Sequence, residues 1–238
     1  ADHGVAEAQY RLGALYLTDR SKETHVNVVI DWYRCAATQG HILAQCALGL
    51  LYSDGKKVPK DMSQAREWFL KAAEQGDAKA QWNLALMLVN GSGGVKKDLK
   101  QAFVFCQKAA QQGFVPAQAT LGILFAKMKK PDRAVEWWRK AAEQGDPEAQ
   151  FNLAMAFIKG QGVDQDMGTA LNWLLKASEQ GVVSAQSKLG LMYATGDGVV
   201  LDPIEAHKWF LVASHLGDIA AHSNVNHSGR QLAPMQVA

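Results

Sequence analysis

The chain has 238 residues, of which 48% are hydrophobic and 20% charged, and its formal net charge is +2. Such a composition can bury an apolar core. The near balance of positive and negative charge argues against a nucleic-acid partner, because binding nucleic acid needs a concentrated basic surface. No stretch approaches the ~18–20 apolar residues of a membrane span, so we expect no membrane insertion. We interpret Cys35, Cys46 and Cys106 as small buried or half-buried thiols, with a contact between the first two as the alternative.

Helical segments that end in glycine recur along the chain. These glycines are 32 to 37 residues apart and stand at Gly40, Gly76, Gly113, Gly145, Gly181 and Gly217. A fixed period of this length is typical of solenoid proteins, in which each repeat is one pair of helices. The spacing predicts six repeats and a C-terminal capping region (5–40, 41–76, 77–113, 114–145, 146–181, 182–217; then 218–238).

The first helix of each repeat has one face on which the same three kinds of residue recur. A glutamine is followed three residues later by leucine and then at once by a small residue. The small residues are Gly13, Gly49, Ala85, Gly122, Ala154 and Gly190. A glycine inside a helix costs about 1 kcal/mol relative to alanine. Its recurrence therefore predicts that another helix crosses there too closely for a side chain.

The repeated glutamine borders this core face. It stands at Gln9, Gln45, Gln81, Gln118, Gln150 and Gln186. A buried amide must find hydrogen-bond partners. We expect a hydrogen bond between helices, and a role in binding a ligand is the alternative.

The second helix of each repeat places one aromatic residue among alanines. These aromatic residues are Trp32, Trp68, Phe105, Trp137, Trp173 and Trp209. A large ring beside small residues predicts helix-on-helix packing, so we assign all of them to the core. Four aspartates precede second helices, where a carboxylate caps free backbone N–H groups: Asp61, Asp98, Asp166 and Asp202. Glycines at the ends of second helices predict left-handed C-terminal caps.

These motifs resemble the Sel1-like repeat family, a branch of the tetratricopeptide-type solenoids. The resemblance rests on Ala80-Gln81 with Leu84-Ala85, on Gly162 to Asp166, and on Ala65 and Trp68 with Lys71 to Gly76. It covers residues 5–217 and implies an all-α, right-handed superhelical solenoid of helix-turn-helix repeats. It also implies a role in assembling complexes, often in bacterial signalling, envelope assembly or host contact. Repeat one departs from the pattern at residues 20–25, and repeat four has a short connection at 127–132.

A second face of the first helices is apolar where solvent is expected. It comprises the residue after each repeated glutamine and those four and seven positions further on. One interpretation is packing of first helices against each other; the other is a concave groove for a protein or peptide partner. For the groove we predict these contact residues: Tyr10, Leu50, Trp82, Leu86, Ile123, Phe151, Met155 and Leu191. Large rings dominate interface energies, which makes Trp82 the leading candidate.

No motif indicates catalysis, a metal site or a cofactor. The glycine-rich stretch at 91–97 lacks the order of a phosphate-binding loop, and His222 and His227 are five residues apart rather than four. We therefore expect a protein-binding scaffold or adaptor and not an enzyme. The alternatives are a cell-wall or sugar-like ligand-binding protein or weak hydrolase of the bacterial envelope, and a structural spacer.

Overall fold

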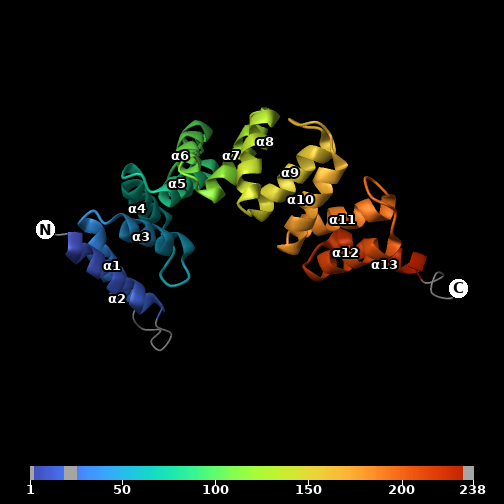
Figure 1. Cartoon of the computed structure of the whole chain (residues 1–238). Helices are drawn as coiled ribbons and strands as arrows, with labels where there is room; N and C mark the ends of the chain where they lie inside the picture. The colour runs from blue at the N-terminus through green and yellow to red at the C-terminus, as the bar shows by residue number, and fades with distance from the viewer. Residues whose placement is uncertain (1–2, 19–25, 233–238) are drawn as a thin grey trace. The chain divides into compact units, whose positions relative to one another are not determined.

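The computed structural model describes the backbone of residues 3–18 and 26–232 and the side chains of 4–18 and 26–225. The chain is all-helical throughout the described part, as the sequence predicts (Figure 1). Its helices are α1 (His3–Thr18), α2 (Val26–Thr38), α3 (Ile42–Asp54), α4 (Met62–Glu74), α5 (Ala78–Asn90), α6 (Leu99–Gln111), α7 (Val115–Lys127), α8 (Pro131–Glu143), α9 (Pro147–Lys159), α10 (Met167–Glu179), α11 (Val183–Thr195), α12 (Pro203–His215) and α13 (Ile219–Leu232).

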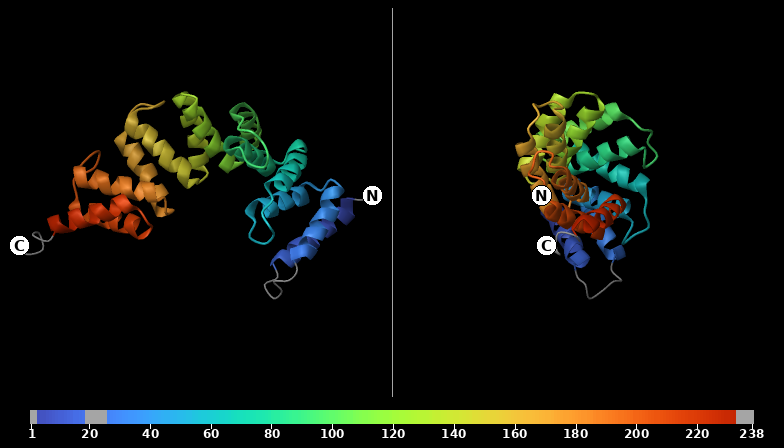
Figure 2. Two further views of the ribbon diagram at one scale, coloured as in Figure 1. Left: turned by 180° about the vertical axis from the view of Figure 1, so that it is seen from behind. Right: turned by 90° about the vertical axis from the view of Figure 1, so that its right-hand side faces the viewer.

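The helices form two compact units, Ala1–Ala117 and Gln118–Ala238. Odd-numbered helices are the first helices of their repeats, and even-numbered helices are the second ones. In the first unit each helix from α1 to α6 packs against the next one, and in the second unit the same holds from α8 to α13 (Figure 2). This is a solenoid of helix-turn-helix pairs. The irregular connection of repeat one and residues 233–238 of the capping region lie outside the described residues.

The predicted helix caps are present. The carboxylates of Asp61 and Asp98 each accept two backbone N–H bonds of 3.0 Å in the first turns of α4 and α6. Asp202 caps α12 in the same way, and Asp166 accepts the backbone N–H of Thr169 at 3.0 Å in the first turn of α10. At the other ends, Gly76, Gly113, Gly145 and Gly181 have φ of 93°, 85°, 92° and 85°. Local sequence therefore fixes where α4, α6, α10 and α12 start and where α4, α6, α8 and α10 stop.

The close crossing of helices at the small residue is also present. A Cβ atom at Gly49 would lie 2.6 Å from the ring of Phe69. The equivalent Cβ at Gly13, Gly122 and Gly190 would lie 2.4 to 2.6 Å from ring atoms of Tyr33, Trp138 and Phe210. Where the first helix carries glycine at this position, the glycine thus leaves space for a ring of the second helix, and we call this position the glycine seat.

The ring that lies on this glycine does not belong to the repeated aromatic residue. It belongs to the residue immediately after the repeated aromatic: Tyr33 after Trp32, Phe69 after Trp68, and likewise at Trp138 and Phe210. Of the repeated aromatic residues only Trp68 is buried, and the others are partly exposed. The assignment of all six to the core is correct for Trp68, whereas Phe105, Trp173 and Trp209 pack against core clusters and stay partly exposed. The reason is that neighbouring helix positions point about 100° apart and both carry large side chains.

The seat and its occupant vary together along the chain. Where the first helix has alanine instead of glycine, at Ala85 and Ala154, the corresponding second-helix residues are Cys106 and Leu174, which carry no ring. Both are fully buried, and Ala154 and Leu174 lie in one core cluster. A methyl group on one helix is matched by a smaller side chain on the other, which keeps the interior close-packed.

The repeated glutamine joins helices, as predicted. The amide nitrogens of Gln45, Gln81, Gln150 and Gln186 donate to carbonyl oxygens at the ends of the preceding second helices, at 3.0 to 3.2 Å. The amide oxygens of the repeated glutamines in the first five repeats accept from another glutamine near the end of the second helix of the same repeat. These contacts are Gln39–Gln9, Gln75–Gln45, Gln112–Gln81, Gln144–Gln118 and Gln180–Gln150, at 2.7 to 3.0 Å.

Candidate protein-interaction surface

The eight residues predicted for the groove lie on the first helices α1, α3, α5, α7, α9 and α11, and none is fully buried. We call this surface the first-helix face. Ile123 and Leu191 are 39% and 45% exposed, and the other six have intermediate exposure. These residues are thus apolar and at least partly accessible within each unit. Whether they bind a partner is a separate question.

The residues at the start of this face also contact the next repeat. The ring of Tyr10 stacks on His41 with centroids 4.9 Å apart, and Trp82 packs edge-on against Phe114 at 5.7 Å. Phe151 packs against a buried cluster that contains Val182. His41, Phe114 and Val182 each stand just before the next first helix. The rings are therefore partly engaged in packing between repeats.

The polar members of this position follow the same rule. Ser187 donates a hydrogen bond to Asp218, which stands just before α13 and also caps it. Burial, together with the nearby Asp77 carboxylate, raises the pKa of Cys46 to about 12. At the first position of the face, an apolar side chain thus contacts an apolar side chain just before the next first helix, and a polar one contacts a polar one. This correspondence favours the packing interpretation for the first position of the face.

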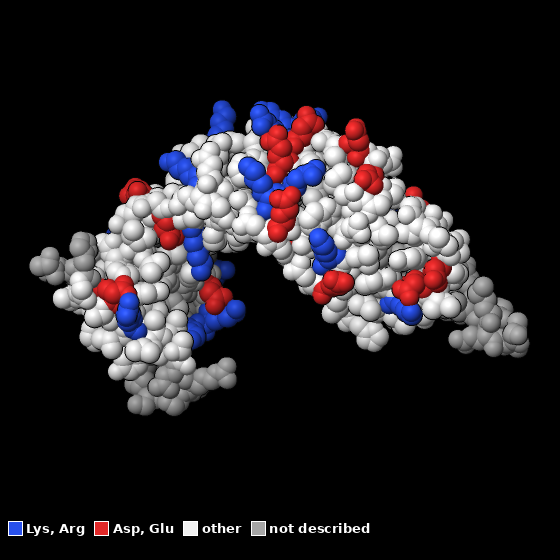
Figure 3. Space-filling model, in the orientation of Figure 1, with Lys and Arg blue, Asp and Glu red and all other residues white. Residues whose placement is uncertain are grey.

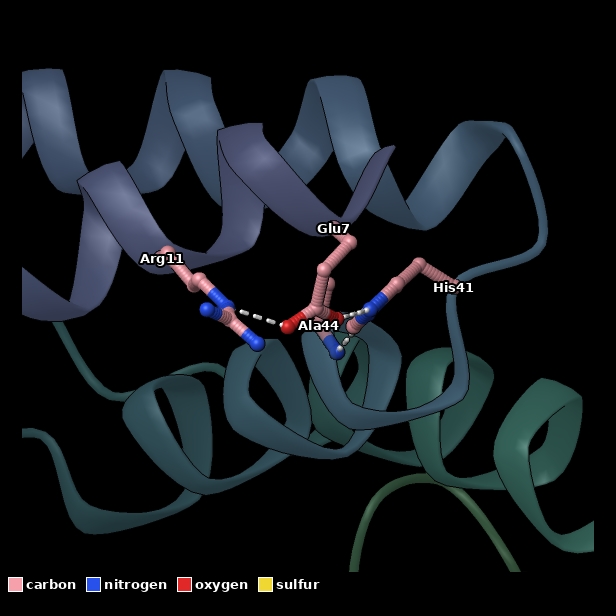
Figure 4. A network of polar contacts seen from close by, with 4 residues as sticks. All are labelled: Glu7, Arg11, His41 and Ala44. Carbon is pink, nitrogen blue, oxygen red and sulfur yellow. Dashed lines mark hydrogen bonds and ion pairs between the residues drawn. The ribbon is translucent and has the colours of Figure 1, made fainter. Parts of the chain in front are cut away.

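A polar network strengthens the contact at Tyr10. Glu7 on α1 lies between Arg11 and His41 and contacts them at 2.5 and 2.9 Å (Figure 4). The hydrogen bond from His41, followed by that from Arg11, lowers the pKa of Glu7. The other ring nitrogen of His41 accepts the backbone N–H of Ala44 at 3.2 Å, so the histidine takes the capping place held by Asp77 and Asp146 in later repeats.

The middle position of the face is more open. It is occupied by Leu50, Leu86, Ile123, Met155 and Leu191. Leu50 and Met155 line pockets of about 620 and 470 Å³, which we call the α2 pocket and the α8 pocket after the helix that supplies the ring in each.

The two pockets occupy equivalent places in different repeats. Tyr33 and Trp138, the rings that sit on Gly13 and Gly122, line them. Leu17 in the α2 pocket corresponds to Ala126 in the α8 pocket, and Asp54 corresponds to Lys159. Each pocket thus lies between two successive first helices. Both belong to the repeats whose connections depart from the common pattern, at 20–25 and 127–132.

Other kinds of site have less support within the described residues. Among them, no three His, Cys, Asp or Glu side chains gather where they could hold a metal ion. The helices there are also too short or too polar to cross a membrane. The three cysteines are free thiols; Cys46 and Cys106 are buried as predicted, but Cys35 is exposed, so the prediction was wrong for that residue. Cys106 donates to the carbonyl of Ala117 at 3.2 Å. On the face that Figure 3 displays, charges of both signs are interspersed.

The sequence model of the Sel1 repeat matches residues 6–22, 30–41, 42–77, 78–114, 117–146, 147–182 and 183–218. The chain belongs to the Sel1 repeat family. Among curated proteins none matches it significantly. The matched segments follow the helix pairs, and the first two together make up the pair α1–α2.

Solved structures of Sel1 repeat proteins resemble this one. A Sel1 repeat protein from Oxalobacter formigenes has 34% identity and a TM-score of 0.79 over 87% of this chain and 84% of its own. The protective antigen c5321 of uropathogenic Escherichia coli has 32% identity and a TM-score of 0.71 over 98% of this chain, which spans 58% of the antigen. YrrB, described as a TPR protein with an unusual peptide-binding site, covers 82% of this chain and 97% of its own at 18% identity and a TM-score of 0.52, which bears on the fold alone.

The Sel1 pattern revealed the first-helix face but not the pockets. Lys129, Trp138 and Lys159 escaped the sequence analysis because they belong to three different helix ends or faces and share no spacing. One signal was available: the short connection of repeat four, which places Lys129 and Pro131 side by side at the pocket.

Proposed function

We propose that this Sel1 repeat chain is a non-enzymatic scaffold that binds a partner protein through the first-helix face of each unit. Sel1 and TPR-like repeats generally mediate protein–protein interaction and are generally non-enzymatic. The observation that carries the proposal is the accessible apolar middle position of that face, together with the two pockets it borders.

The physical argument concerns apolar surface. Isolated exposed apolar residues are common, but a line of them with adjoining pockets marks interaction sites. Leu50, Leu86, Ile123, Met155 and Leu191 recur at one position of every repeat from the second to the sixth. A Leu or Ile that a partner covers contributes only in proportion to the area still exposed, which is 39% for Ile123 and 45% for Leu191, and so about 1 kcal/mol each. The ring residues at the first position of the face pack between successive repeats, and the residues at the middle position contact the partner.

Matched substitutions test this proposal. Purified wild-type protein and a Leu191→Asp variant would be used to capture proteins from a lysate of the source cells. We expect the aspartate to reduce the amount of captured partner at least tenfold, because it puts an unpaired charge into a desolvated contact. Val212→Asp is the control, since Val212 on the second helix α12 is 44% exposed, against 45% for Leu191.

A second matched pair separates binding from folding. Ile123 is 39% exposed on α7 and Leu70 is 42% exposed on α4. Circular dichroism should show all four aspartate variants to be folded, because their side chains already reach solvent. Equal loss of the partner in the Leu70 and Val212 variants would place binding on the second helices and contradict the proposal.

A further inference from the structure

The α8 pocket combines apolar lining residues with two lysines. Its interior is formed by Trp138 with Pro131 and Met155, and Lys129 and Lys159 line it as well. None of its lining residues is acidic. Neither lysine forms an ion pair with a described residue, whereas Arg133, two residues after Pro131, is paired with Glu136 at 3.0 Å.

The two lysines come from the same end of two first helices. Lys159 is in the last turn of α9, and Lys129 follows the end of α7. Asn152 and Gln161 add amide groups to the pocket wall. A negatively charged group there would meet two cations and amide donors, while a large apolar side chain would contact the Trp138 ring.

Lys129 keeps its place at a conformational cost. Its φ is 56°, which makes it the one residue other than glycine with positive φ in the described part of the chain. The N–H groups of Lys129 and Lys130 bond to the carbonyls of Ala126 and Phe125 at 3.0 Å, which is the usual cap after a helix. In other repeats glycine takes the left-handed position after the first helix, as at Gly55 and Gly160. Glycine adopts this left-handed conformation without strain, whereas lysine at the same position is strained.

The α2 pocket provides a comparison within the same chain. There Asp54 replaces Lys159 and is paired with Lys56 at 3.3 Å. Lys57 donates to the carbonyl of Leu17 at 3.2 Å. Around the α2 pocket the one carboxylate is therefore paired with a lysine and Lys57 bonds to a carbonyl, whereas the two lysines of the α8 pocket form no ion pair with a described residue.

We propose that the α8 pocket binds an acidic–apolar segment of a partner protein, with a large apolar side chain on Trp138 and a flanking carboxylate at Lys129 and Lys159. This inference rests on the proposed function and specifies the chemistry of the partner. Charge complementarity selects an acidic peptide: two unpaired cations attract it, and the volume of about 470 Å³ suits one large side chain.

Three peptides of equal length test the inference on the full chain: acetyl-Ser-Asp-Phe-Asp-Ser-amide, its Asn-Phe-Asn counterpart and its Lys-Phe-Lys counterpart. Binding would be followed by the NMR shift of the Trp138 indole N–H, identified from its loss in Trp138→Phe. Two exposed ion pairs are each worth up to about 1 kcal/mol, so we expect the acidic peptide to bind about five- to tenfold tighter than the neutral one. Salt at about 0.5 M should reduce this advantage.

Lys129→Gly is the decisive variant because it removes a cation and relieves the backbone at once. It should unfold at the same or a higher urea concentration than the wild type, yet reduce the advantage of the acidic peptide to about twofold. Lys159→Gln should reduce it to the same extent. Lys56→Gln, beside the α2 pocket, is the matched control and should leave the advantage unchanged.

Several results would overturn the inference. These are equal binding of the acidic and neutral peptides, an advantage that survives Lys129→Gly, or no shift at Trp138. Phenylacetate binding as tightly as the acidic peptide would indicate a site for small carboxylates, and a shift that depends on protein concentration alone would indicate self-association. If the peptides fail while Leu191→Asp still releases the captured partner, only the α8 pocket is refuted. If Leu191→Asp also has no effect, the proposed function fails with it.

Discussion

At the scale of single residues, the glutamine contacts show how one hydrogen-bond pair is repeated and where it stops. Gln45, Gln81 and Gln150 each donate to a carbonyl of the preceding helix pair and accept from a glutamine near the end of their own pair. At the last position, Leu216 stands where Gln39, Gln75 and Gln180 stand in earlier repeats. The amide oxygen of Gln186 is consequently buried without a hydrogen-bond partner.

Restoring this partner should stabilise the protein. We expect Leu216→Gln to raise the free energy of unfolding by about 1 kcal/mol, because an unsatisfied buried acceptor costs about 1–3 kcal/mol and Leu216 is itself 55% exposed. The urea midpoint measures the change. Leu216→Glu has the same length but no donor at its end. If it stabilises the chain as much as glutamine does, the gain does not come from the hydrogen bond.

At the scale of helices, the two members of a pair are matched by volume at one crossing point. Gly49 faces Phe69, which is 1% exposed, and Ala154 shares a core cluster with Leu174, which is completely buried. The helix propensity lost at glycine is offset by the apolar surface that the ring buries against the backbone.

Exchanging one member of this match should destabilise the helix pair, and exchanging both should restore it. Gly49→Ala places a methyl group 2.6 Å from the Phe69 ring and should cost about 1–3 kcal/mol despite the better helix propensity of alanine. Gly49→Ala with Phe69→Leu reproduces the Ala154–Leu174 arrangement. In a double-mutant cycle from urea unfolding we expect at least about 1 kcal/mol of favourable coupling. Additive effects would mean that the two positions do not constrain each other.

At the scale of the whole molecule, stability comes from contacts between successive helices. The second unit has its own buried clusters, one around Leu174, Leu189 and Met192 and one that joins Phe210 of α12 to Ala221 of α13. In a solenoid the total stability is close to a sum of repeats and nearest-neighbour interfaces. The position of α13 against α12 agrees with a capping role for 218–238, which stays a prediction.

This arrangement predicts that the second unit folds alone. A fragment of residues 114–238 contains all of α7 to α13 and the clusters named above. We expect it to be helical by circular dichroism and to unfold cooperatively in urea, at a lower midpoint than the full chain because it buries fewer interfaces. A fragment that is unfolded, or that loses helix gradually without a transition, would show that the second unit depends on the first.

The sequence by itself determined the repeat, the helix pairs, their caps and the close crossing at the small residue. These follow from local signals: a period of 32 to 37 residues, aspartate before a helix, glycine after it, and offsets of three and four within it. It also identified the inter-helix role of the glutamines, because a polar residue beside a core face must be satisfied.

Only the tertiary structure decided which of two adjacent large side chains occupies the glycine seat. Trp68 and Phe69 are equally apolar in the pattern, and helix rotation alone selects the second. The pairing of Tyr10 with His41 and of Trp82 with Phe114 joins residues about thirty positions apart, which periodicity does not relate. The α8 pocket likewise exists only where the ends of α7 and α9 meet the ring of α8. Local energetics set the helices, whereas the packing of repeat on repeat sets the surfaces available for binding.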